Sequence, residues 1–225
     1  MMAKVVAVYT GQGLSDPLKK VFDEKLPDSK LINIIDDSII SEVVTEGVIT
    51  PGVKKRLFQY YQNAVDMGAD VILNTCSSVG EVADLARQFI DIPIVKIDEA
   101  MAKEAVSLYG SIGVIATLPS TLEPTMRLIQ KQAESIGKSV KIVDGLAKGA
   151  YDPLVSGRPD LHDQIILESA STLAQQVDAI VLAQGSMARM EQALHEKTGI
   201  PVLSSPARGI SEIKSLLGES SHAKQ

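Results

Sequence analysis

Residues 68–95, GADVILNTCSSVGEVADLARQFIDIPIV, decide how this chain folds. The stretch begins with an apolar run, continues through a polar turn around Cys76 and an amphipathic segment, and ends on a second apolar run. This order predicts a buried strand, a helix and a second strand parallel to the first.

The same pattern recurs in residues 176–203, QVDAIVLAQGSMARMEQALHEKTGIPVL. Three pairs of residues fall at one constant spacing: Asp70 and Asp178, Cys76 and Gln184, and Pro93 and Pro201. The first apolar runs of the two halves match as well, with VAVYT over GVIAT and Thr10 over Thr117. Any two strand–helix–strand units share this outline, but a spacing that holds across several elements favours an internal duplication.

Short apolar runs alternate with amphipathic segments along the whole chain. Strands are predicted over residues 4–10, 30–36, 71–75, 92–98, 111–117, 139–146, 178–184 and 200–205. This alternation predicts an α/β protein with parallel sheets covered on both faces. We expect two flavodoxin-like three-layer lobes related by a pseudo-two-fold. The first comprises residues 1–98 and is completed by a helix over 207–218, and the second comprises residues 99–206. The expected site is the crevice at the carboxyl ends of the strands.

Composition and charge exclude several classes of function. The chain has 225 residues, a net charge of -6, only 4% aromatic residues and no tryptophan. The low aromatic content argues against a surface that stacks nucleic-acid bases, and the negative charge argues against non-specific nucleic-acid binding. No apolar run reaches the roughly 18 residues of a membrane span, and the start, MMAKVVAVYTG, is too soon interrupted for a signal peptide. We expect a cytoplasmic protein with no nucleic-acid or membrane partner, and a homo-oligomer remains open.

Cys76 is the single cysteine and follows a predicted strand. The amides of the next helical turn carry partial positive charge, so they are expected to favour the thiolate and lower the thiol pKa. Such a group can take a proton from carbon and return it. The competing interpretation is a small buried hydrophobe, although the neighbours Asn74, Thr75, Ser77 and Ser78 are unusually polar for that role.

Three motifs carry a family resemblance. GADVILNTCSSVG resembles the first cysteine motif of the aspartate/glutamate and hydantoin racemase superfamily, GVIATLPSTL resembles its central turn, and DAIVLAQGSMARM stands where its second cysteine motif belongs. The resemblance covers nearly the whole chain. It implies cofactor-independent proton transfer at the carbon next to a carboxylate, with two cysteines flanking that carbon. No pyridoxal phosphate or metal is implied, and no glycine-rich phosphate loop or metal-ligand spacing is present in the sequence.

The second cysteine of the family is replaced here by Gln184. A glutamine exchanges no proton near neutral pH, so three outcomes stay open. Another group such as His162 replaces the thiol; or one base suffices, as in a decarboxylase or tautomerase; or the protein binds a small acid without turning it over. In the two alternatives in which the protein is an enzyme, the catalytic residues are Cys76 and Gln184.

The residues expected to bind the small carboxylic acid lie in the turns that follow the strands. They are Thr10, Gln12, Asn74, Thr75, Ser77, Ser78, Thr117, Ser120, Thr121, Gly185 and Ser186. Helix capping explains Ser120 or Thr121 equally well. Candidate cations near the strand ends are Lys96, Arg189 and Arg208, each more typical of a solvated charge.

Overall fold

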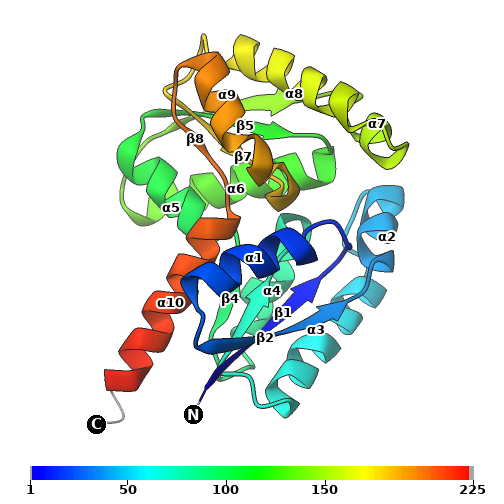
Figure 1. The fold of residues 1–225 in the computed structure, drawn as a ribbon, viewed down its shortest axis with the longest axis vertical. Coiled ribbons are helices and arrows are strands. Elements are labelled where there is room, and N and C mark those ends of the chain that lie inside the picture. Colours follow the sequence, from blue (N-terminus) through cyan, green and yellow to red (C-terminus); the bar gives the residue numbers. More distant parts are fainter. Residues whose placement is uncertain (1, 223–225) are drawn as a thin grey trace. The chain divides into compact units, whose positions relative to one another are not determined.

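The computed structural model describes the backbone of residues 2–222 and the side chains of residues 2–219. The chain divides into two compact units (Figure 1). The first runs to Ile97 and includes the segment from Pro206 onward, and the second is Asp98–Ser205.

The first unit holds a parallel four-stranded sheet in the order β2-β1-β3-β4. Its strands are β1 (Ala3–Tyr9), β2 (Ser29–Ile35), β3 (Val71–Asn74) and β4 (Ile94–Lys96). Its helices are α1 (Ser15–Lys25), α2 (Ser38–Glu46), α3 (Pro51–Asp66), α4 (Gly80–Ala86) and α10 (Pro206–His222), with a 3-10 turn η1 (Ser77–Val79).

Side-chain alternation along β1 divides the first unit into layers. Val6 and Val8 face the core formed with α2, α3 and α4, whereas Val5 and Ala7 face the core formed with α1 and α10. Helix α10, drawn red in Figure 1, packs against α1 and β4. Because successive strand residues point to opposite faces, one apolar run supplies both cores.

The second unit repeats this topology in the order β6-β5-β7-β8, again all parallel. Its strands are β5 (Ser111–Ala116), β6 (Lys141–Leu146), β7 (Ala179–Leu182) and β8 (Val202–Leu203). Its helices are α5 (Glu99–Leu108), α6 (Pro119–Ser135), α7 (Tyr151–Val155), α8 (Pro159–Leu173) and α9 (Glu191–Thr198), with a 3-10 turn η2 (Gly185–Met190).

Helices cover both faces of the second sheet. One core joins the sheet to α5 and α6, and the other joins it to α8 and α9. The second core is tight because two strand glycines admit Leu173 of α8: a Cβ atom on Gly113 or Gly145 would lie 2.5 or 2.6 Å from that leucine. The predicted α/β class with two three-layer lobes is confirmed.

Two helices, α2 and the short α7, were not predicted from the sequence. The α2 sequence, SIISEVVTE, is rich in β-branched residues, which favour strands over helices. Its helical form depends on packing, since Ile39 and Val43 are buried in the core with α3. Tertiary contacts therefore override local propensity here.

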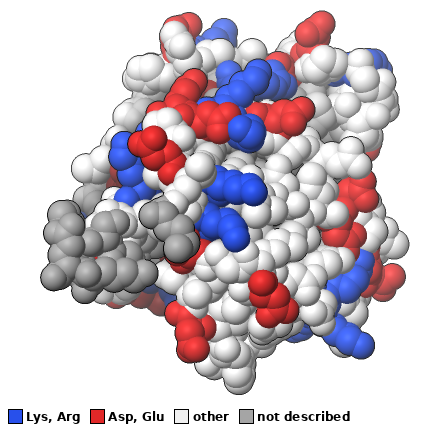
Figure 2. Space-filling view, turned by 60° about the horizontal axis from the view of Figure 1, so that its bottom comes forward, with Lys and Arg blue, Asp and Glu red and all other residues white. Residues whose placement is uncertain are grey.

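Charge is mixed on the surface. On the face in Figure 2, Lys and Arg side chains lie among Asp and Glu side chains. No helix within residues 2–222 combines the length and the apolar character needed to cross a bilayer.

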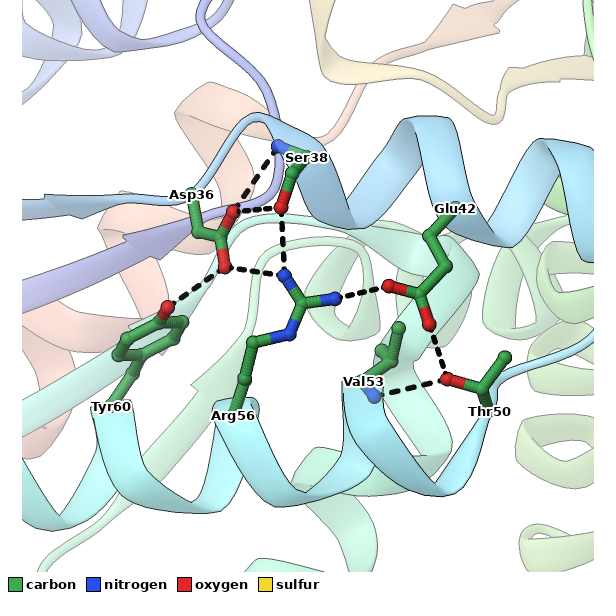
Figure 3. Close-up of polar contacts among 7 residues, drawn as sticks. All are labelled: Asp36, Ser38, Glu42, Thr50, Val53, Arg56 and Tyr60. Atoms are coloured by element: carbon green, nitrogen blue, oxygen red, sulfur yellow. Dashed lines mark hydrogen bonds and ion pairs between the residues drawn. The ribbon is translucent and has the colours of Figure 1, made fainter.

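A polar network fastens α2 to α3 and to the end of β2 (Figure 3). Arg56 donates to Asp36 Oδ2 at 3.0 Å and to Ser38 Oγ at 2.7 Å, and its other terminal nitrogen pairs with Glu42. Tyr60 donates to Asp36 Oδ2 at 2.8 Å. Burial alone raises the pKa of Asp36, but the bonds from Ser38 and Tyr60 and the Arg56 charge outweigh it, so the pKa lies below its ordinary value.

We predict that Arg56→Met lowers the free energy of unfolding by about 1–2 kcal/mol at pH 7, because two carboxylates lose a shared partner. Asp36 has a lowered pKa, so its contribution is complete above the ordinary carboxyl pKa of about 3.9 and is lost as pH falls through the lowered value. The variant should therefore lose less stability on acidification. Urea unfolding at a series of pH values measures both effects.

Lys19→Met is the matched control, since the Lys19–Asp23 pair is more than half exposed at both residues. It should change the free energy of unfolding by less than about 0.5 kcal/mol. Equal effects of the two substitutions would show that the Arg56 network adds nothing beyond a surface ion pair.

Candidate functional site

The carboxyl ends of β1 and β3 meet at one edge of the first sheet, and Thr10 and Cys76 follow them. Val8 of β1 pairs in register with Asn74 of β3. The amide and the hydroxyl of Thr75 both donate to the Val8 carbonyl, at 3.2 and 3.0 Å. These two hydrogen bonds from the turn to the neighbouring strand fix the chain directly before Cys76.

Cys76 is half-buried and packs against the core beneath α3. Its backbone is extended, with φ −125° and ψ 119°, and η1 starts at the next residue. The sulfur receives hydrogen bonds from the Thr10 side chain, from the amides of Ser78 and Val79, and from the Ser78 hydroxyl. Each of these donors stabilises the thiolate relative to the thiol.

The expectation that these donors lower the pKa of Cys76 below its ordinary value is wrong for the free protein. Burial is the largest influence and raises the pKa, while the hydrogen bonds from Thr10, Ser78 and Val79 lower it without outweighing burial. Desolvation disfavours the charged form of any thiol. Cys76 is therefore a thiol at neutral pH, able to give a proton before it can take one.

Asn74 and Thr75 lie beneath the turn. Asn74 is 1% exposed, and its Oδ1 accepts a bond of 3.0 Å from the Tyr61 hydroxyl while its Nδ2 donates at 3.0 Å to the Cys76 carbonyl. The Thr75 hydroxyl is engaged with Val8, as described above. Their polar atoms hold the Cys76 turn.

Gln12 stands apart from the Cys76 group. Its side chain is exposed, and its Nε2 donates to Asp37 at the start of α2. Ser77 and Ser78, in contrast, are both buried in η1, where Ser78 bonds the sulfur. The structure thus brings Thr10, Asn74 and Ser78 to Cys76 and leaves Gln12 with α2.

The matching edge of the second sheet carries Thr117, after β5, and Gln184, after β7. The amide and the hydroxyl of Thr117 both donate to Gln184 Oε1, at 2.8 and 3.0 Å. Because the oxygen is held by Thr117, the end of the side chain that can meet a ligand is the amide nitrogen, a hydrogen-bond donor.

Gln184 takes the same place in its unit as Cys76 does in the first. Each stands two residues after the end of its strand and directly before a 3-10 turn. The backbone of Gln184, with φ −117° and ψ 126°, is extended like that of Cys76.

The remaining predicted residues of the second unit lie in two turns. Thr121 is buried in the first turn of α6, and Ser120 Oγ beside it is buried without a hydrogen-bond partner in the structure. Gly185 and Ser186 begin η2, with Ser186 exposed. Ser120 therefore has unused hydrogen-bonding capacity at this turn.

Two of the three candidate cations, Lys96 and Arg189, have carboxylate partners. Lys96 is 4% exposed and pairs with Asp84 at 2.9 Å, and Arg189 pairs with Asp163 through both terminal nitrogens. Arg208 is half-buried on α10. Lys96 and Arg189 are thus already neutralised by carboxylates.

His162, the candidate replacement base, is buried on α8. Its Nδ1 lies 2.8 Å from the Ala150 carbonyl, so Nδ1 carries the proton and the ring orientation is fixed. Within residues 2–219, no group of three or more His, Cys, Asp and Glu side chains is arranged to hold a metal ion.

Sequence reasoning missed Tyr61. It occupies a core position of the amphipathic α3 and is fully buried, so its spacing indicates packing and nothing more. Its bond to Asn74 joins residues that the sequence alone gives no reason to pair.

Two α/β units of the same topology, one with a thiol and one with an amide at the corresponding turn, define the class of fold. The chain belongs to the Asp/Glu/hydantoin racemase family, whose model matches residues 10–213. No curated protein sequence matches the chain at a significant level.

Solved structures of racemases share the fold. A glutamate racemase from Bacillus anthracis is 15% identical with a TM-score of 0.76, over 97% of this chain and 82% of that one. An allantoin racemase from Klebsiella pneumoniae is 14% identical with a TM-score of 0.70, over 97% and 89%. An aspartate racemase from Picrophilus torridus is 13% identical with a TM-score of 0.71, over 96% and 94%.

We predict that iodoacetamide alkylates Cys76 slowly at pH 7 and faster at alkaline pH, with a midpoint above the ordinary thiol pKa of about 8.5. Thr10→Val removes a donor to the thiolate and should slow alkylation at pH 7 by about three- to tenfold. Because the chain has one cysteine, mass spectrometry of the intact protein follows this reaction alone. An unchanged rate in the variant would mean that Thr10 does not act on the sulfur.

Proposed function

We propose that this protein is a cofactor-independent enzyme of the racemase and epimerase type, with Cys76 as the acid/base. It moves a proton at the carbon next to the carboxylate of a small acid. The observation that carries the proposal is the convergence of Thr10, Ser78 and Val79 on the sulfur of the only cysteine in the chain. Family membership supports it.

The chemistry at Cys76 follows from its surroundings. Removal of a proton from the α-carbon leaves negative charge on the substrate, so the enzyme needs a thiolate before this step and hydrogen-bond donors during it. The donors from Ser78 and Val79 stabilise the thiolate. A bound ligand that shifts the balance between burial and these hydrogen bonds would allow the thiolate to form. After proton transfer the thiol can return the proton to carbon.

The second turn supplies recognition in this proposal. Gln184 takes the place of a second cysteine and cannot exchange a proton near neutral pH. With Oε1 fixed by Thr117, its amide nitrogen can donate to a carboxylate or to the oxygen of a developing enolate. Ser120, whose hydroxyl has no partner, is a further donor in the second unit.

A single-base reaction is the second candidate, favoured by the raised pKa of Cys76. In a decarboxylation the carboxylate leaves as carbon dioxide and its electron pair stays on carbon. The Cys76 thiol then protonates that carbon, and water reprotonates the thiolate. A tautomerase needs the same one group. Binding of a small acid without turnover is the remaining alternative.

The small acids to test first follow from the neighbours, one of which, a glutamate racemase from Francisella tularensis, was solved in complex with D-glutamate. In deuterium oxide, we expect the protein to exchange the α-proton of at least one acid among the enantiomers of aspartate and glutamate, 5-substituted hydantoins and substituted malonates. Cys76→Ser should lower the rate at least about 100-fold, because a serine hydroxyl is not acidic enough to exchange. Proton NMR measures the exchange.

The control is the melting temperature of Cys76→Ser, which should equal that of the wild type, so that a lower rate does not reflect unfolding. Release of carbon dioxide would select the decarboxylase. Tight binding of an acid with neither proton exchange nor release of carbon dioxide would reject both enzyme proposals in favour of the binding protein.

We predict that Gln184→Cys raises the ratio of inversion to exchange, because it supplies a second group that exchanges protons. Gln184→Leu, of similar size, should weaken binding of the acid without raising that ratio. Chiral chromatography beside NMR gives the two rates. A ratio that stays at the wild-type value in Gln184→Cys would show that position 184 is not the place of a second acid/base.

A further inference from the structure

Tyr61 has a polar tip in an otherwise apolar place. The residue is fully buried on α3, within the core that α3 shares with the first sheet. A phenylalanine would fill the same space, and a buried hydroxyl costs free energy unless it is hydrogen-bonded. The Tyr61 hydroxyl has such a partner, Asn74 Oδ1, at 3.0 Å.

The bond from Tyr61 orients the Asn74 amide. With Oδ1 turned to the tyrosine, Nδ2 faces the Cys76 carbonyl and donates to it at 3.0 Å. The opposite orientation would set two oxygens against each other. Asn74 is itself 1% exposed and held in register between β1 and β4, so the amide has no other arrangement of equal energy.

The Cys76 carbonyl is the point at which this chain of bonds reaches the site. It also accepts from the Val79 amide at 3.4 Å, which closes the turn over which the sulfur lies. The same Val79 amide and that of Ser78 bond the sulfur. A rotation of the Cys76 peptide would therefore move the sulfur away from its donors.

We propose that Tyr61 is a positioning residue, which acts through Asn74 to fix the turn that directs the Cys76 sulfur at the amides of Ser78 and Val79. The proposal rests on the proposed role of Cys76 as the acid/base. Burial first, and then the nearby Cys76, raise the pKa of Tyr61 above its ordinary value. The phenol therefore stays protonated at neutral pH and remains a donor there.

The test is Tyr61→Phe, which removes one hydroxyl from a packed core. We expect alkylation of Cys76 by iodoacetamide at pH 7 to slow about three- to tenfold, with its pH midpoint displaced upward, because the thiolate loses well-placed donors. If an acid is turned over, kcat should fall by a similar factor with KM within about twofold of wild type, since Tyr61 does not touch the substrate.

Tyr60→Phe is the matched control on the same helix. It removes a hydroxyl that bonds Asp36 in the network of Figure 3 and has no bond to Asn74. Both variants should lose some stability in urea unfolding, but only Tyr61→Phe should move the alkylation profile. An effect of equal size in Tyr60→Phe would reduce Tyr61 to a merely structural role.

Asn74→Asp tests the second link. It keeps an acceptor for Tyr61 but sets a carboxylate oxygen against the Cys76 carbonyl, so its alkylation profile should move in the same direction and at least as far. A wild-type profile in either Tyr61→Phe or Asn74→Asp overturns the proposal. Alkylation needs no substrate, so this result is independent of whether any acid is exchanged; failure of the proposed function would show as absent exchange with the Tyr61 effect intact.

Discussion

The register of β1 against β3 is the constraint on which the site depends. Val8 lies opposite Asn74, and the Val8 carbonyl takes both donors of Thr75. A slip of one residue would turn every side chain of the strand to the other face of the sheet. It would exchange the two cores and separate Thr10 from Cys76. The thiol is thus positioned by backbone hydrogen bonds first and by side chains second.

The thiol surroundings combine two opposing effects. Burial favours the neutral form of Cys76, and four hydrogen bonds favour the charged form without prevailing. A group balanced in this way changes its proton affinity strongly when a ligand alters either effect, and pKa values displaced by burial and specific partners are common in catalytic sites. The same balance explains why a single thiol can serve as an acid in one reaction and as a base in another.

Much of the fold was predictable because apolar runs and their spacing carry it. The strands, the parallel topology and the duplication follow from residues 68–95 and 176–203. Helix α2 was not predictable, since its β-branched sequence folds as a helix only against α3. The predicted direction of the Cys76 pKa shift was wrong for a similar reason. The sequence locates the hydrogen-bond donors, but the extent of desolvation depends on packing by distant segments.

The site also shows what duplication leaves free to change. Topology and backbone conformation are kept at the two turns, whereas the side chains have become a thiol at Cys76 and an amide at Gln184. Their supports differ accordingly: Thr10 donates to a sulfur, and Thr117 donates twice to a carbonyl oxygen. A threonine follows the corresponding strand in both units, and its hydroxyl suits either partner. One scaffold can therefore carry different side chains at corresponding turns without altering its sheets, so the chemistry at each turn depends on a side chain that the fold does not constrain.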